Sequence, residues 1–240
     1  VALSGECADE VFGGYPWFER SELLEADTFP WCPDLEFRRA VVKPELWESL
    51  QVEDYVQARY QQSLAEMPAL PGEALWERRR REVGWLSLNW FMSTLLDRKD
   101  RMSMAAGLEV RVPFCDHHLV EYVWNIPWAM KAMNGQRKQV LRDAAEGLLP
   151  EELLRRPKSP YPKTHDPLYE QLVRARLLTI LDDRDAPIHS LVDEKALRAG
   201  LLSDAGDYGK PWFGQLMAGP QMLAYLIQIN EWMSRYHLTV

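Results

Sequence analysis

Apolar residues recur at helical spacing along most of this 240-residue chain, and this periodicity most limits the folds that it can adopt. Only segment 1–3 resembles the end of a buried strand, because it is apolar and a Ser-Gly turn follows it at once. No second strand–helix–strand unit is visible, so we expect no parallel sheet from this chain alone. The pattern predicts a mainly α fold.

Capping and breaking residues divide the chain into expected helices. The first should begin at Glu6 and end at Gly13 and Gly14, and residues 28–44, with three prolines, should form a loop with short turns. Asp116 and Asp166 are suited to cap helices, and Pro150 to open a short one. The other expected helices cover residues 45–67, 73–96, 136–148, 193–202 and 220–236, and the Asp166 helix should reach about residue 181.

Composition excludes several classes of protein. Apolar residues make up 47% of the chain, including 10 Trp, which excludes a disordered chain. Cys7, Cys32 and Cys115 are odd in number and widely spaced, so they suggest neither a zinc site nor a disulfide framework, and they favour a reducing cytoplasm. No apolar run approaches the roughly 20 residues that cross a membrane. The chain starts without Met or a signal-peptide pattern, so we expect a piece of a longer protein.

The negative charge lies at one end of the chain. Residues 1–36 hold nine acidic residues and one basic residue, which accounts for the whole net charge of −8. An acidic end disfavours non-specific binding of nucleic acid and tolerates a divalent cation or a basic partner. A solvated acidic face explains most of these charges.

The first fifteen residues have the pattern of a phosphate site. A strand end, a Ser4-Gly5 turn and a helix start would direct backbone N–H groups at an anion, and Gly5 would allow its close approach. Glu6, Asp9 and Glu10 follow at i, i+3 and i+4, so Glu6 and Asp9 could share a face that Glu10 can join. Carboxylates beside a phosphate site commonly hold Mg²⁺. Acidic residues that complement a helix dipole are the plain alternative.

Four sequence blocks carry a resemblance to one family. The segment LSGECADEVFGGY at residues 3–15 closely resembles an ATP-site motif of the glutamine-hydrolysing asparagine synthases. Three further blocks agree in family order: DRMSMA at 100–105 with LEVRVPF at 108–114 and the following Asp116-His117, KQVLR at 138–142, and PKSPYPK at 157–163. The blocks extend from residue 3 to about 165, and the last 75 residues match none.

The resemblance implies a fold and a reaction. Residues 1–240 would be the helical C-terminal part of an α/β synthetase domain of the adenine-nucleotide alpha-hydrolase-like (PP-loop) type. ATP and Mg²⁺ would bind there, and the aspartate side-chain carboxylate would attack the α-phosphate to give an aspartyl-adenylate and pyrophosphate. Ammonia released from glutamine by a separate glutaminase domain would then form asparagine and AMP.

The family pattern also implies residue roles. Ser4 and Gly5 would contact the nucleotide through their backbones, and Glu6 would lie beside the acyl-adenylate, as a base for ammonia. Asp9 would hold Mg²⁺ and pyrophosphate. Lys138 would meet the α-phosphate, where a compact ammonium suits developing charge.

The proline-rich segment 157–165 cannot be a helix, and it carries two basic side chains. Lys158 and Lys163 in this rigid loop could close over phosphates. Cys7 occupies a position where many family members have Gly. It would either be a thiol of lowered pKa at a helix start or, as we favour, a small residue that fills a small site.

Other candidates favour structural interpretations. We expect His117 and His118 to be surface or packing residues beside the Asp116 cap, not metal ligands. We expect Arg111 and Asp116 to be mainly structural, the Arg78–Arg81 run to be a solvated helix face rather than an anion site, and the Trp-rich helices to form core.

Two parts of the family pattern are missing from these residues. No Ser-Gly-Gly-x-Asp-Ser pyrophosphate loop is present, and none of the three cysteines is an N-terminal nucleophile of a glutaminase domain. We therefore expect the chain alone to be inactive. The alternatives are a β-lactam synthetase-like amide ligase and a non-catalytic helical module that binds a partner protein. The oligomeric state stays open, with a homodimer as one option.

Overall fold

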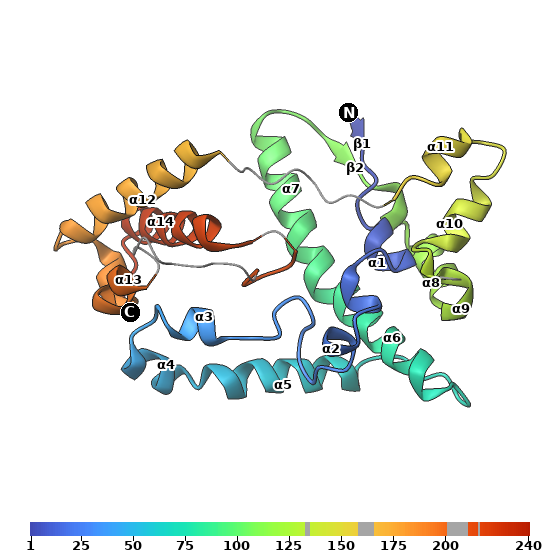
Figure 1. Cartoon of the computed structure of the whole chain (residues 1–240), viewed down its shortest axis with the longest axis horizontal. Coiled ribbons are helices and arrows are strands. Elements are labelled where there is room, and N and C mark those ends of the chain that lie inside the picture. The colour runs from blue at the N-terminus through green and yellow to red at the C-terminus, as the bar shows by residue number, and fades with distance from the viewer. Residues whose placement is uncertain (133–134, 158–165, 201–210, 216) are drawn as a thin grey trace. The chain divides into compact units, whose positions relative to one another are not determined.

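The computed structural model describes residues 1–132, 135–157, 166–200, 211–215 and 217–240. Within these residues the chain is mainly α-helical (Figure 1), as the apolar periodicity predicts. It divides into two compact units: the first comprises Val1–Pro30 and Arg59–Ser159, and the second Trp31–Ala58 and Pro160–Val240. None of the described helices is long and apolar enough to cross a membrane.

The first unit holds both strands and most of the sequence blocks. Its strands are β1 (Ala2–Leu3) and β2 (Val110–Arg111). Its α-helices are α1 (Ala8–Phe12), α2 (Ser21–Leu24), α6 (Leu75–Leu86), α7 (Ser93–Ala105), α8 (His117–Trp124), α9 (Trp128–Lys131), α10 (Gln139–Ala144) and α11 (Glu151–Leu154). Short 3₁₀ segments lie at Pro16–Phe18 and Pro113–Cys115.

The two strands form a parallel ladder, which corrects the expectation that this chain builds no parallel sheet. Ala2 is paired with Val110 and Leu3 with Arg111. The ladder is two residues long, and its partners lie more than 100 residues apart, so no local strand pattern announces it. The strand is also not buried as expected, because Leu3 is 75% exposed.

Helix α1 is held by its apolar face. Ala8, Val11 and Phe12 pack in one cluster with Val123 of α8, and Phe114 meets the Phe12 ring edge-on at 5.9 Å between centroids. Because these residues bury one side of α1, the side that carries Asp9 is left for polar contacts.

Helices α6 and α7 are joined without a loop. The segment Ser87–Met92 between them is a π-helix, so the helix expected over residues 73–96 continues to Ala105. Ser87 is fully buried there, where it donates to the Val83 carbonyl (2.7 Å) and accepts from Trp17 Nε1 (3.2 Å). This second bond satisfies a buried indole and ties the π segment to Pro16–Phe18.

The arginine run on α6 is not simply a solvated face. Arg79 donates to the carbonyls of Leu24 and Ala26 and to Tyr60 Oη. Arg81 is a nearly buried partner of Glu73 at 2.7 Å. These arginines satisfy two backbone carbonyls and the Glu73 carboxylate. Sequence spacing does not reveal these partners.

The second unit contains α3 (Glu36–Arg39), α4 (Pro44–Leu50), α12 (Pro167–Asp182), α13 (Glu194–Ala199) and α14 (Gly219–Tyr236). Helix α5 (Val52–Ala65) crosses the division between the units. The helix expected over 45–67 is broken into α4 and α5 because Gln51 has a left-handed backbone, with φ of 48°.

Helices α12 and α14 lie side by side (Figure 1) and build the core of the second unit. Leu177 and Ile180 of α12 pack with Met222 and Leu223 of α14, and Leu177 and Leu223 are completely buried. The side chain of Asp166 accepts from Leu168 N at 2.9 Å, which confirms the predicted cap of α12.

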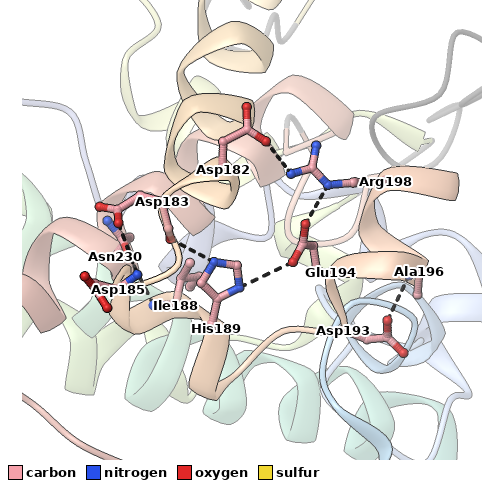
Figure 2. A network of polar contacts seen from close by, with 10 residues as sticks. All are labelled: Asp182, Asp183, Asp185, Ile188, His189, Asp193, Glu194, Ala196, Arg198 and Asn230. Carbon is pink, nitrogen blue, oxygen red and sulfur yellow. Dashed lines mark hydrogen bonds and ion pairs between the residues drawn. The ribbon is translucent and has the colours of Figure 1, made fainter.

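A polar network links the end of α12, the 3₁₀ segment Pro187–Ser190 and α13 (Figure 2). Arg198 donates to Asp182 and to Glu194, each at 2.8 Å, and thereby joins α12 to α13. His189 lies between them, with Nε2 3.0 Å from the Asp183 carbonyl and Nδ1 3.6 Å from Glu194 Oε2. The network is largely exposed, so its charges add little to stability.

The tryptophans are only partly core residues. Trp17 and Trp47 are buried, whereas Trp76 on α6 and Trp232 on α14 are 50% and 57% exposed. The expectation that the Trp-rich helices are core is therefore wrong for these two exposed positions.

Candidate functional site

The Ser-Gly-Glu block forms a turn between β1 and α1. Ser4 N donates to the Arg111 carbonyl at 2.9 Å, which continues the ladder, and Glu6 N lies 3.3 Å from Ser4 Oγ. Cys7 has φ of 75°, so α1 begins at Ala8 and not at Glu6 as expected. Because α1 has only five residues, its dipole is weak, and the side chains must supply most of the charge at this site.

An ion pair joins two of the predicted site residues. Lys138 Nζ lies 2.9 Å from Asp9 Oδ1, although 129 residues separate them in the chain, and both side chains are about four-fifths buried. Lys138 has a left-handed backbone, with φ of 58°, and immediately precedes α10. The structure therefore brings the first block and the KQVLR block together.

Gly14 makes room for this ion pair. A Cβ atom at position 14 would overlap Asp9 Oδ1, and it would lie 2.5 Å from Lys138 Cε and 2.7 Å from Asp9 Cγ. The glycine is needed for close approach and not for an unusual φ. From the sequence, Gly14 is expected to end the first helix and belongs to the first block, and neither observation reveals this clearance.

Glu6 meets a cation that sequence reasoning missed. Lys99 Nζ lies 3.8 Å from Glu6 Oε2 and donates to the Val110 carbonyl at 3.3 Å. Glu6 Oε2 is buried and accepts no hydrogen bond from the described residues. Lys99 immediately precedes the DRMSMA block, and no local pattern marks it as a partner of Glu6.

Glu10 does not join Glu6 and Asp9. It is only 4% exposed and accepts a 2.8 Å hydrogen bond from Tyr15 Oη. Burial raises the pKa of the Glu10 carboxyl, and burial together with the nearby carboxylates raises the pKa of Tyr15. Glu10 is thus a structural residue that holds the turn after α1, which corrects the expectation of an acidic trio.

The carboxylates at this turn offer few ligands for Mg²⁺. Among the described residues no group of three His, Cys, Asp or Glu side chains could hold a metal by itself. Mg²⁺ commonly takes only one or two protein carboxylates and completes its shell with phosphate oxygens and water. The Asp9 carboxylate, whose Oδ1 also pairs with Lys138, fits that limited role.

The other predicted candidates have different outcomes. Asp116 caps α8 by accepting from His118 N (2.9 Å) and Leu119 N (3.3 Å), as predicted. Arg111 is exposed and pairs with Glu109 at 2.7 Å, so it keeps an acidic partner. Lys158 and Lys163 lie outside the described residues.

A disulfide bond overturns the cysteine prediction. Cys7 is bonded to Cys115, whose Cα atom is 5.8 Å away across a sequence separation of 108 residues, while Cys32 is free. Neither expectation for Cys7, a reactive thiol or a passive space-filler, describes it. The long separation hid the pair, because the β1–β2 ladder and the packing of Phe114 on α1 bring Cys115 near only in the folded chain.

Comparison with known proteins agrees with the four blocks. Residues 1–234 match the family model described as asparagine synthase. The chain is 49% identical, over its full length, to asparagine synthetase [glutamine-hydrolyzing] 3 of Bacillus subtilis, and it spans 39% of that protein.

Shorter matches extend the agreement. Asparagine synthetase [glutamine-hydrolyzing] 1 of Bacillus subtilis is 42% identical over 73 residues, which cover 30% of this chain and 12% of that protein. The asparagine synthetase [glutamine-hydrolyzing] of Mus musculus is 45% identical over 67 residues, covering 27% and 12%. The match over nearly the whole chain shows that this protein belongs to the asparagine synthase family.

Proposed function

We propose that this chain is part of the ATP-using domain of a glutamine-hydrolysing asparagine synthase. This domain adenylates the aspartate side-chain carboxylate and amidates it with ammonia released from glutamine, with AMP and pyrophosphate as the other products. The observation that carries the proposal is the buried ion pair between Asp9 and Lys138, with the clearance that Gly14 provides for it.

Adenylation separates pyrophosphate from the α-phosphate, and negative charge develops between them. Lys138 is suited to stabilise that charge, because its ammonium is held in a site that is about four-fifths buried, where water screens it little. The contact with Asp9 fixes the direction of the long lysine side chain before substrate binds, which lowers the entropy cost of ordering it.

Asp9 and Glu6 have separate roles in this proposal. Asp9 would hold Mg²⁺, and the ion would supply further positive charge beside the phosphates. Glu6 lies beside the acyl-adenylate and accepts a proton from ammonia as the amide forms. Lys99 Nζ lies 3.8 Å from Glu6 Oε2 and helps to hold that carboxylate in position.

The backbones of Ser4 and Gly5 contact the nucleotide, with Gly5 N–H as the donor because Ser4 N–H is bonded to the Arg111 carbonyl. A Cβ atom at Gly5 would meet nothing within 4 Å. Lys158 belongs to the proposal as a further phosphate contact from the proline-rich loop. In the family pattern the pyrophosphate loop and the glutaminase domain lie in other parts of the protein. We therefore propose that residues 1–240 form the C-terminal part of a PP-loop synthetase domain, that this part alone is inactive, and that the enzyme works in the cytoplasm.

The test is aspartate-dependent ATP–pyrophosphate exchange by the full-length protein that contains this chain. Lys138→Ala should lower exchange by at least about a hundredfold, because it removes charge that is needed in the transition state. Asp9→Asn should lower it similarly and raise the Mg²⁺ concentration needed for half-maximal exchange. The exposed Lys195 gives a matched control, and Lys195→Ala should leave exchange unchanged.

Each outcome separates the competing functions. Exchange that depends on a different carboxylic acid would replace aspartate as the substrate and favour a β-lactam synthetase-like ligase. Absence of exchange with every acid tested, while a partner protein stays bound, would favour a non-catalytic module. Full exchange by Lys138→Ala would exclude the role assigned to the ion pair.

A further inference from the structure

We propose that Cys7 and Cys115 form a reversible oxidation site that fixes the backbone of the turn before α1. The oxidised form holds Glu6 and Asp9 in the arrangement described above, and the reduced form releases the turn. The conformational part stands by itself. The effect on catalysis rests on the proposed function.

The position of the bond is the first argument. Cys7 lies in the chain between Glu6 and Asp9 and is only 3% exposed. Cys115 ends the 3₁₀ segment that follows β2, and it also contacts Met92 Sδ, 3.6 Å from its Sγ. The bond therefore ties the turn before α1 to the end of the 3₁₀ segment Pro113–Cys115.

The backbone of Cys7 is the second argument. Its φ of 75° is in the left-handed region, which costs a residue with a side chain on the order of 1–3 kcal/mol. Helix α1 begins directly after it and is too short to impose that conformation. The covalent link to Cys115 holds the strained residue in place, so cleavage of the link allows Cys7 to leave the left-handed region.

The exchange is chemically complete with a low-molecular-weight thiol and its disulfide as the co-reactants. A thiolate of the reductant attacks Cys115 Sγ, which is the more accessible sulfur, and Cys7 leaves as a thiolate that takes up a proton. A second reductant thiol then attacks the sulfur that the first reductant molecule contributed to the mixed disulfide, and the Cys115 thiol is released. The protein gains two electrons and two protons, and the reductant becomes a disulfide.

Release of Cys7 changes the neighbouring site residues. Glu6 precedes it directly, and Asp9 lies in the first turn of α1, whose Val11 N donates to the Cys7 carbonyl at 3.0 Å. A turn that samples several conformations holds Glu6 and Asp9 in the observed arrangement for a smaller fraction of the time. Reduction should therefore lower adenylation and leave the second unit's α12–α14 core unaltered.

The experiment compares the oxidised and reduced full-length protein in glutathione redox buffers. Thiol alkylation followed by mass spectrometry counts the free cysteines, and hydrogen exchange follows the peptide that covers residues 4–11. We expect two additional alkylated cysteines after reduction and, in the same protein, exchange of that peptide at least about fivefold faster.

Two variants at position 7 separate the bond from the conformation. In Cys7→Ser the amide hydrogens of residues 4–11 should exchange rapidly in every buffer, because the bond is absent and a serine side chain still disfavours positive φ. Cys7→Gly also lacks the bond but tolerates positive φ, so its exchange should be slower than that of Cys7→Ser and equally insensitive to the buffer. Cys32→Ser removes the free thiol and should retain the full response of the wild-type protein.

The proposal is overturned if both cysteines stay alkylatable in oxidising buffer, or if residues 4–11 exchange equally fast in both forms. Neither measurement uses enzyme activity, so both can succeed even if aspartate proves not to be the substrate. ATP–pyrophosphate exchange measured on the two forms then tests the catalytic consequence, and equal rates would remove that part alone.

Discussion

The effect of burying an ionisable side chain in this protein depends on the groups that it contacts, as Glu10 and Lys131 illustrate. Glu10 is buried against the hydroxyl of Tyr15, so one hydrogen bond compensates part of the loss of water. Lys131 is only 8% exposed and borders a cavity of about 30 Å³ that Arg81 also lines. Burial and the charge of Arg81 lower the pKa of Lys131 to about 8.

Lys131→Met should stabilise the protein at neutral pH. Below pH 8 the folded protein must bury an ammonium, and between pH 8 and about 10.5 the unfolded chain binds more protons, so wild-type stability rises with pH in that window. Denaturant unfolding at pH 7 should show a gain of up to about 3 kcal/mol, which shrinks toward zero as pH approaches 10.5. Lys195→Met at an exposed site is the control, and a destabilised Lys131→Met protein would contradict the assignment.

Gly14→Ala should disrupt the ion pair between Asp9 and Lys138, because the added Cβ would overlap Asp9 and crowd Lys138 Cε. We expect a loss of about 1–3 kcal/mol in unfolding free energy and at least a tenfold loss of ATP–pyrophosphate exchange in the full-length protein. Gly84→Ala is the matched control: its Cβ would meet nothing within 4 Å in α6, and it should be neutral or stabilising. Wild-type exchange by Gly14→Ala would show that this clearance is not required.

At the level of elements, helix boundaries follow local capping more closely than apolar periodicity. Asp116 and Asp166 start α8 and α12 where the sequence predicts, because an Asp side chain reaches N–H groups only two or three residues ahead. Periodicity predicts the boundaries less accurately at Gln51, where one left-handed residue separates α4 from α5, and at Ser87–Met92, where a π-helical segment joins α6 to α7.

Asp116→Ala should destabilise α8 by about 1 kcal/mol, because it leaves the N–H groups of His118 and Leu119 without their acceptor. Asp116→Asn keeps a side-chain oxygen in the same place and should lose much less. Thermal unfolding of the two variants measures the difference. Equal losses would mean that the charge of Asp116, and not its capping oxygen, stabilises this helix.

At the level of the molecule, stability depends on cores that no single helix can form alone. In the second unit, α12 and α14 meet through completely buried side chains such as Leu177 and Leu223. Dispersion and the removal of apolar area from water act there together, so a cavity is costly.

Leu177→Ala should cost about 2–5 kcal/mol of unfolding free energy, because it opens a cavity in this core. Leu172→Ala, on the same helix but 59% exposed, should cost less than about 1 kcal/mol. Denaturant unfolding compares the two. Similar costs would show that the α12–α14 contact is not the main support of this unit.

Sequence alone determined the helical class, the caps of α8 and α12 and the resemblance of four blocks to one family. Helical periodicity, each cap and each block depend on residues within a few positions of one another, so they can be recognised without knowledge of the tertiary structure. The tertiary structure decided that Glu10 turns inward, that Lys138 reaches Asp9, that β1 pairs with β2 and that Cys7 is bonded to Cys115. Each of the last three joins residues about 100 or more positions apart, and such contacts are set by how the whole chain packs, not by any local pattern.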